Sequence, residues 1–241
     1  MYKIIITFFL LISSIISLNL YADNGNECVV LLHGLGDVKF SMLKIESALK
    51  DEGYFTKNIG YSSTGKTIES LADEKLSKVV ELLKESGYEK IHFVTHSMGG
   101  LIVRYYLQAN NIPAGSRIVM LSPPNHGSEV ANHFKESAFY KLIVGDVGQE
   151  LTTDSKTLTK LKPILPKIGI IAGNKSTNPY FSKIIPGDDD GRVAVDNTKL
   201  TEMNDFIIVN STHLSIKYNR EVIEQIKYFL NSGKFKHANK V

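Results

Sequence analysis

The chain has 241 residues, 43% of them hydrophobic, with a net charge of +3 and a single cysteine, Cys28. This length suits one domain with a sizeable buried core. The small net charge argues against a nucleic-acid-binding surface, and a lone cysteine excludes an intramolecular disulfide.

The N-terminus carries the pattern of a secretory signal peptide. Lys3 is followed by an uncharged, largely apolar run over residues 4–20, and Ala22 stands just before Asp23. This order predicts a signal peptide over residues 1–22, cleaved near Ala22, and an exported domain over residues 23–241, periplasmic or secreted. A retained membrane anchor is the alternative, because the run approaches spanning length. A lipoprotein is less favoured, since Cys28 does not directly follow the cut.

Short apolar runs alternate with longer amphipathic segments along the rest of the chain. Strands are predicted over residues 28–32, 54–59, 90–95, 117–121, 168–172 and 206–209. Helices are predicted over residues 40–49, 67–86, 98–109 and 221–230. This alternation predicts an α/β fold: a mainly parallel sheet of about six strands with helices on both faces. The long mixed segment near residues 125–167 interrupts the alternation and is predicted to be a partly helical cap.

Ser97 stands where a predicted strand meets a predicted helix, in Thr95–His96–Ser97–Met98–Gly99. A G-x-S-x-G nucleophile elbow requires this placement, because its sharp turn lifts the serine hydroxyl above the sheet. Thr95 replaces the usual first glycine, a departure that a slightly wider turn can accommodate. The alternative is a serine that only caps a helix.

The loop after the first strand, beginning His33–Gly34–Leu35–Gly36, is the expected second half of the site. In an enzyme with this elbow, the loop supplies one oxyanion-hole N–H and the residue after the nucleophile supplies the other. We therefore assign these donors to the backbone of Leu35 and Met98.

A catalytic base is expected after the last strand, because the chain order of such sites is serine, acid, histidine. His213 follows the apolar run 206–209 and precedes the last helix, whereas His33, His92 and His96 precede Ser97 and are expected to be structural. The alternative for His213 is an ordinary surface histidine.

The acid is sought in Asp188–Asp189–Asp190–Gly191, which lies between the fifth and sixth predicted strands. Any of the three aspartates could reach His213. Asp190 is preferred because Gly191 permits the tight turn that aims its side chain inward, and its two neighbours are expected to be solvated. The run does not have the ligand spacing of an EF-hand calcium loop.

Together these segments resemble the bacterial lipase-like α/β hydrolases, and they are similar to the neighbouring palmitoyl-thioesterase-like and GPI-inositol-deacylase-like groups. The blocks that carry the resemblance are VVLLHGLG (29–36), GYSSTGKTIESLA (60–72), FVTHSMGGLIVRYYL (93–107), LSPPNHGSEVA (121–131), DGRVAV (190–195) and THLSI (212–216). The resemblance implies the α/β-hydrolase fold and a serine esterase or lipase with the triad Ser97, Asp190 and His213. In calcium-dependent secreted lipases the residue two beyond the base is an aspartate ligand, whereas here it is Ser215.

The expected activity is ester cleavage through an acyl-enzyme, with a small-molecule or lipid ester as substrate, no metal and no cofactor. Apolar residues near the motifs suggest an acyl pocket that includes Leu35, Met98, Pro123 and Leu214. Contact with a membrane surface is a further expectation. A thioesterase or acyltransferase would use the same residues, and a non-catalytic binding module would be expected to lack a triad member.

Overall fold

The computed structural model describes residues 26–237 and places six strands in one sheet, in the order β2-β1-β3-β4-β5-β6. The strands are β1 (Glu27–Leu32), β2 (Phe55–Ile59), β3 (Lys90–His96), β4 (Arg117–Leu121), β5 (Lys167–Gly173) and β6 (Asp205–Val209). All five pairings are parallel. The six-stranded α/β sheet predicted from the apolar runs is therefore confirmed. The predicted signal peptide lies outside the described residues.

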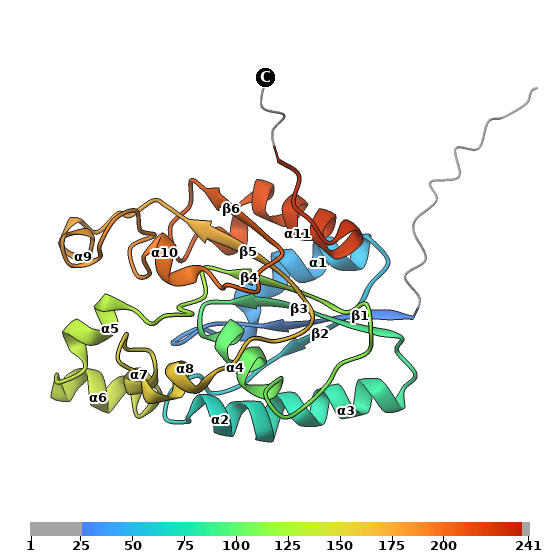
Figure 1. Ribbon diagram of the computed structural model, residues 1–241, viewed down its shortest axis with the longest axis horizontal. Coiled ribbons are helices and arrows are strands. Elements are labelled where there is room, and N and C mark those ends of the chain that lie inside the picture. Colours follow the sequence, from blue (N-terminus) through green and yellow to red (C-terminus); the bar gives the residue numbers. More distant parts are fainter. Residues whose placement is uncertain (1–25, 238–241) are drawn as a thin grey trace, which may run out of the picture.

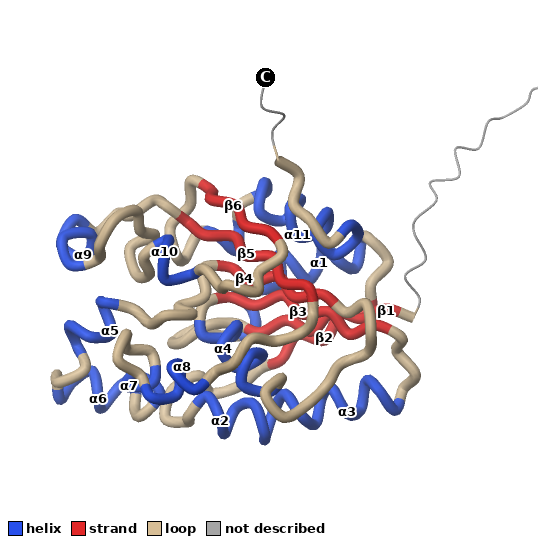
Figure 2. Tube along the Cα trace, in the orientation of Figure 1, coloured by secondary structure: helices blue, strands red, loops and turns tan. Residues whose placement is uncertain are grey.

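Both faces of the sheet are buried, because successive side chains of a strand point to opposite faces. In β1, Cys28 and Val30 enter one core while Val29 and Leu31 enter the other. Figure 1 shows α1 (Leu43–Asp51) and α11 (Arg220–Ser232) above the sheet. Below the sheet it shows α2 (Ile68–Leu71), α3 (Ser77–Glu85) and α4 (Met98–Tyr106). The strands form a twisted layer between these helices (Figure 2).

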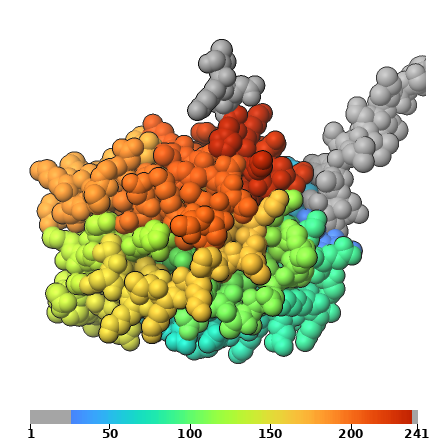
Figure 3. Space-filling model, in the orientation of Figure 1, coloured from blue at the N-terminus to red at the C-terminus, as the bar shows by residue number. Residues whose placement is uncertain are grey.

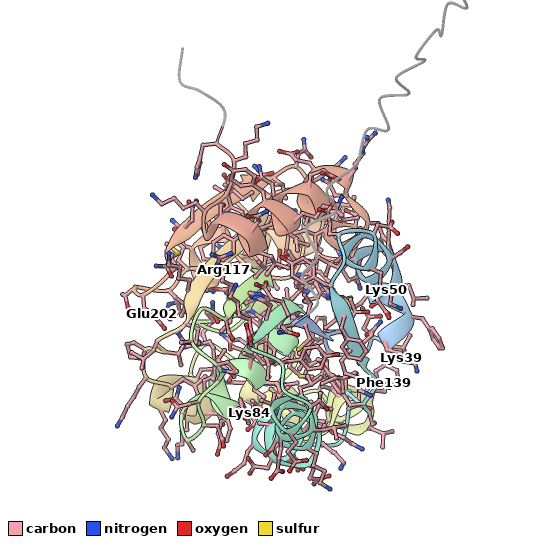
Figure 4. The ribbon with its side chains drawn as sticks, turned by 90° about the vertical axis from the view of Figure 1, so that its right-hand side faces the viewer. Lys39, Lys50, Lys84, Arg117, Phe139 and Glu202 are labelled. Carbon is pink, nitrogen blue, oxygen red and sulfur yellow. The ribbon has the colours of Figure 1, made fainter. Side chains whose placement is uncertain are left out.

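Figure 4 views the molecule from the amino-terminal ends of the strands. Arg117, the first residue of β4, lies near the middle, and Lys84 of α3 lies in the lower part of the molecule. The opposite edge of the sheet, where the strands end, lies at the left in Figure 1. Loops that follow parallel strands meet at that edge, and ligands of such sheets bind there.

Two predicted helices differ from the observed ones. The segment predicted as a helix over residues 67–86 is divided by a π-helical stretch, η2 (Ala72–Leu76), which packs against α4. Thr67 caps the first part by accepting a hydrogen bond from the Ser70 N–H. The helix predicted over residues 40–49 begins as a 3₁₀ turn, η1 (Lys39–Met42). Apolar spacing alone does not distinguish these helix types, because all place residues on one face within a turn or two.

The predicted cap contains four short helices: α5 (Glu129–Phe134), α6 (Ala138–Val144), α7 (Val147–Glu150) and α8 (Lys156–Lys160). In Figure 3 this segment, yellow-green, covers the lower left of the visible face, below the orange segment that follows β5. That orange segment includes α9 (Pro179–Ile184) and α10 (Val195–Thr198), which were not predicted. None of the helices formed by residues 26–237 combines the length and the apolar character that crossing a bilayer requires.

Candidate active site

Ser97 forms the sharp turn between β3 and α4. Its backbone has φ 53° and ψ −125°, a left-handed conformation that a side chain with a Cβ rarely adopts. The surrounding contacts maintain this strain, and the Ser97 N–H donates to the Leu121 carbonyl oxygen at 2.9 Å. The turn gives the hydroxyl the placement that the elbow motif predicts.

Two glycines make room for this turn. An added Cβ on Gly34 would lie 2.9 Å from the Ser97 Cβ, and one on Gly99 would lie 2.7 Å from the Leu32 carbonyl oxygen. Both distances are too short for a real Cβ, so the loop after β1 and the start of α4 approach the elbow only because these positions lack side chains.

Thr95 occupies the first elbow position, where a glycine is usual. Its Oγ1 would be 3.3 Å from a Cβ on Gly100, which shows that the side chain of Thr95 lies against a glycine in the first turn of α4. The departure is therefore accommodated by the absence of a side chain at Gly100.

His213 lies in the loop between β6 and the 3₁₀ turn η3 (Ile216–Tyr218), with its ring directed at Ser97. Its Nε2 is 2.9 Å from Ser97 Oγ, and its Nδ1 is 2.7 Å from Asp190 Oδ2. Because an ionised carboxylate only accepts, Nδ1 carries the proton and Nε2 is free to accept one from the serine hydroxyl. His213 is only 5% exposed, so little of its surface is open to water that could compete for these contacts.

Asp190 is held by more than its contact with His213. Its Oδ1 accepts hydrogen bonds from the N–H groups of Arg192, at 3.0 Å, and Val193, at 2.9 Å. Burial by itself would raise the pKa of this carboxyl. The charge that His213 carries once it is protonated and its hydrogen bond, with the hydrogen bonds of Ser122 and Val193, outweigh burial and hold the pKa of Asp190 below its ordinary value. Asp190 is therefore kept ionised beside the histidine.

The two neighbouring aspartates differ from each other. Asp188 is exposed, as expected, but the prediction that Asp189 is also solvated is wrong, because Asp189 is only 7% exposed. Its Oδ1 accepts the Gly191 N–H at 2.6 Å, and its backbone forms an isolated bridge with Ala194. Asp189 thus stabilises the tight turn that points Asp190 inward.

Sequence reasoning missed Ser122, which follows β4. It is fully buried and has φ 43°, the second positive φ of a non-glycine residue within residues 26–237. Its Oγ accepts the Gly173 N–H at 3.2 Å, and its hydroxyl is a hydrogen-bond partner of Asp190. The only sequence signal is its position directly after a buried strand.

The backbone N–H groups proposed as oxyanion donors belong to Leu35, after β1, and Met98, at the first position of α4. Neither donates one of the turn or loop hydrogen bonds found within the described part of the chain. The Met98 N–H belongs to the first turn of α4, where backbone N–H groups have no partner inside the helix. The absence of such a bond is what the proposed role as oxyanion donors requires of both groups.

His96 and an ion pair beside it were also missed as parts of the site. His96 is 2% exposed, and its Nε2 lies 2.8 Å from the His213 carbonyl oxygen. Its Nδ1 is 4.0 Å from Asp37 Oδ2, and the Asp37 carboxylate pairs with the almost fully buried Lys217. The prediction that His96 is structural rested on chain order, which excludes it as the triad base but not as a neighbour of that base.

A cavity of about 590 Å³ opens over Ser97 and His213. Two of the four predicted pocket residues, Leu35 and Leu214, line it. Met98 is fully buried, and Pro123 packs toward Gly100 while the next residue, Pro124, lines the cavity. The other apolar lining residues come mainly from the cap: Val130, Ala131, Tyr140, Val144, Leu151, Val193 and Tyr218.

Within residues 26–237 no group of three or more His, Cys, Asp or Glu side chains is placed to hold a metal ion. Ser215 is engaged in a local turn, where its Oγ and the Thr212 Oγ1 are 2.9 Å apart.

Comparison with known proteins agrees with this fold. A family model described as palmitoyl protein thioesterase matches residues 28–160, more than half of the chain. The structure is similar to the mature lipase BlEst2 of Bacillus licheniformis, with a TM-score of 0.65 and 19% identity, covering 85% of this chain and 90% of that one.

Two further similar structures are enzymes of related description. The esterase of Thermogutta terrifontis has a TM-score of 0.53 and 12% identity, covering 84% of this chain and 89% of that one. The phospholipase PlaB of Legionella pneumophila has a TM-score of 0.61 and 18% identity over 72% of this chain, which corresponds to 44% of PlaB. At these identities the similarity shows the α/β-hydrolase fold. With the family match, it follows that the chain is a hydrolase that belongs to the palmitoyl protein thioesterase family.

Proposed function

We propose that this protein is a serine hydrolase that cleaves carboxylic esters through an acyl-enzyme on Ser97. The observation that supports the proposal is a chain of two hydrogen bonds. One joins Ser97 Oγ and His213 Nε2, at 2.9 Å, and the other joins His213 Nδ1 and Asp190 Oδ2, at 2.7 Å. Ser97 stands at the strained turn beside the cavity, so its hydroxyl is both activated by His213 and accessible to a substrate.

In the acylation step, Ser97 Oγ attacks the ester carbonyl carbon while its proton moves to His213 Nε2. Asp190 stabilises the imidazolium and fixes the tautomer. The carbonyl oxygen gains a negative charge, which the N–H groups of Leu35 and Met98 stabilise. When the bond to the leaving group breaks, the imidazolium returns the proton to the departing alkoxide, leaving an acyl ester on Ser97.

Deacylation repeats these steps with water. His213 takes a proton from the water as its oxygen attacks the acyl carbon. Collapse of the intermediate breaks the bond to Ser97 Oγ, which regains a proton from His213. The products are a carboxylic acid and the original enzyme, so no cofactor enters the balance.

The cavity lining supports an acyl chain as the group that binds next to Ser97. Tyr140 and Val144 of α6 line the cavity, while Phe139, Leu142 and Ile143 of the same helix are 72%, 82% and 53% exposed. Figure 4 shows Phe139 at the margin of the molecule. A helix that is apolar on both its inner and outer sides suits a protein that takes a lipid ester from a lipid surface.

A thioesterase is the second candidate, favoured by the match to the palmitoyl protein thioesterase family. The same residues would attack a thioester, whose leaving thiolate needs less protonation than an alkoxide does. An acyltransferase would differ only in replacing water as the acceptor. Rates on an oxyester and a thioester with the same acyl chain, and with an added alcohol acceptor, separate the three.

The proposal is tested with a fluorophosphonate probe and a short-chain aryl ester on wild type, Ser97→Ala and His213→Ala. The wild type should be labelled at Ser97. Each variant should lose about 10⁴–10⁶-fold in kcat, and the double variant no more than either single one, because the two residues act as a unit. Full activity of well-folded Ser97→Ala would overturn the proposal.

A further inference from the structure

His96 is a buried titratable residue that the mechanism above does not use. It is the last residue of β3 and directly precedes Ser97. Its ring lies against the ring of His213, with centroids 4.8 Å apart and an interplanar angle of 49°. The only hydrogen bond of its ring within residues 26–237 joins Nε2 to the His213 carbonyl oxygen, at 2.8 Å. A carbonyl oxygen only accepts, so Nε2 must carry a proton.

The surroundings of His96 keep the ring neutral. Burial first, then the charge that His213 carries once it is protonated and the charge of Lys217, hold the pKa of His96 well below its usual range. With the proton on Nε2, Nδ1 is unprotonated, and it has no hydrogen-bond partner within the described residues. A neutral ring in this tautomer can only donate toward His213, so His96 is not a second general base for Ser97.

The peptide groups on both sides of the His213 side chain are thereby fixed. The His213 N–H donates to the Asp190 carbonyl oxygen at 2.8 Å, and the His213 C=O accepts from His96 Nε2 at the same distance. His213 lies in a loop and belongs to no strand or helix. These two hydrogen bonds therefore hold its backbone in place of the regular backbone bonds of a helix or sheet. The partner of one bond is Asp190, in the loop before β6, and the partner of the other is His96, at the turn before Ser97.

We propose that His96 is a positioning residue, which sets the distance between the base and the nucleophile by donating its Nε2–H to the His213 carbonyl. The elbow that raises Ser97 then also fixes the backbone of its base. This inference rests on the proposed serine-hydrolase function. A displacement of reacting groups by about 1 Å can cost about 100-fold in rate, and the loss should appear in kcat, because His96 holds the base and not the substrate.

Two substitutions distinguish the hydrogen bond from simple packing. The amide nitrogen of His96→Gln can reach the position of Nε2, whereas that of His96→Asn reaches only the position of Nδ1. We expect His96→Asn to lose about 100-fold in kcat with KM changed less than about threefold, and His96→Gln to recover most of that loss. His92→Asn, at the other end of β3 and equally buried, is the control: it should change the melting temperature but not kcat.

Equal kcat losses in His96→Gln and His96→Asn, or none in either, would overturn the proposal. If both variants fail to fold, nitrogen-15 spectra of the wild-type histidine rings still test the proposal. A neutral His96 with its proton on Nδ1 could not donate from Nε2 to the His213 carbonyl oxygen, and this result would overturn the proposal. Ser97→Ala is assayed in parallel. If it stays active, the proposed function fails, whereas an inactive Ser97→Ala beside a fully active His96→Asn contradicts only the role of His96.

Discussion

His213 and Asp190 are joined twice, once through side chains and once through the backbone. The ring Nδ1 lies 2.7 Å from Asp190 Oδ2, and the His213 N–H donates to the Asp190 carbonyl oxygen at 2.8 Å. The same aspartate therefore orients the ring and anchors the loop that carries it. Among residues 26–237, neither Asp188 nor Asp189 forms a hydrogen bond with His213, so Asp190 alone of the three aspartates orients the base.

Asp190→Asn should lower kcat by about 10³–10⁴-fold while leaving the fold intact. An asparagine amide would donate to Nδ1 and favour the tautomer protonated on Nε2, which cannot accept the serine proton. Asp188→Asn should stay near wild type, because that side chain is exposed, and Asp189→Asn should chiefly lower stability. Aryl ester turnover and thermal melts of the three variants decide the matter. An active Asp190→Asn beside an inactive Asp189→Asn would mean that Asp190 is not the acid.

Activity should not depend on calcium. Ser215 stands at the position, two beyond the base, where calcium-dependent secreted lipases carry an aspartate ligand. Its hydroxyl is already bonded to Thr212, and a hydroxyl alone is a poor calcium ligand. Ester hydrolysis should proceed at the same rate with and without a chelator. A loss that calcium alone restores, and magnesium does not, would contradict this prediction.

Lys217→Met should lower the free energy of unfolding by on the order of 3 kcal/mol, because it leaves the Asp37 carboxylate largely buried without its partner. The side chains of this pair are 3% and 20% exposed. Lys141→Met is the control: it breaks the exposed pair with Glu136, whose side chains are 49% and 80% exposed, and should have little effect. Urea denaturation measures both, and equal effects would show that the buried pair contributes no more than a surface pair.

The contribution of Asp37 to stability should disappear in acid. Burial alone would raise the pKa of Asp37, but the hydrogen bonds of Lys217, the Val38 N–H and Ser41 outweigh it, so the folded-state pKa is lowered. An aspartate whose pKa is lower in the folded than in the unfolded protein stabilises the fold at pH values above its unfolded-state pKa, near 4. This stabilisation is lost as the pH falls through the folded-state pKa. The difference in unfolding free energy between wild type and Asp37→Asn should therefore become smaller below about pH 4. A difference that grows in acid would contradict the lowered pKa of Asp37.

We propose that the protein is exported and that its mature form begins at Asp23. The basis is Lys3, the uncharged run over residues 4–20 and the small residue Ala22. N-terminal sequencing of the protein from periplasmic and extracellular fractions tests it. A chain that starts at Met1 and stays with the membrane would favour the anchor.

Replacing the exposed apolar side chains Phe139 and Leu142 of α6 by serine should weaken binding to phosphatidylcholine vesicles without changing kcat on a soluble short-chain ester. Each buried apolar side chain contributes about 1.5–3 kcal/mol to such binding. Leu165→Ser is the matched control, because Leu165 is 96% exposed but lies outside the α6 surface. Equal vesicle binding by all three proteins would rule out this surface as the lipid contact.

The sequence by itself determined the sheet and the position of the serine. Apolar runs, glycines and the signals that end a helix are local features of the chain. They mark the strand at Cys28–Leu32 and the turn at Ser97, and the chain order then indicates Asp190 and His213. Such local patterns restrict the backbone whatever the remote contacts are, which explains why the predicted strands lie within one residue of the observed ones.

Only the tertiary structure decided what surrounds the triad. His96 and His213 are separated by 117 positions, and Asp37 and Lys217 by 180, so no local pattern records that they meet. The burial of Asp189 and the choice of Pro124 over Pro123 as a cavity residue depend on how two loops pack above the sheet. These contacts form where loops after different parallel strands converge, and strand order and register, which the apolar runs do not specify, determine which loops those are.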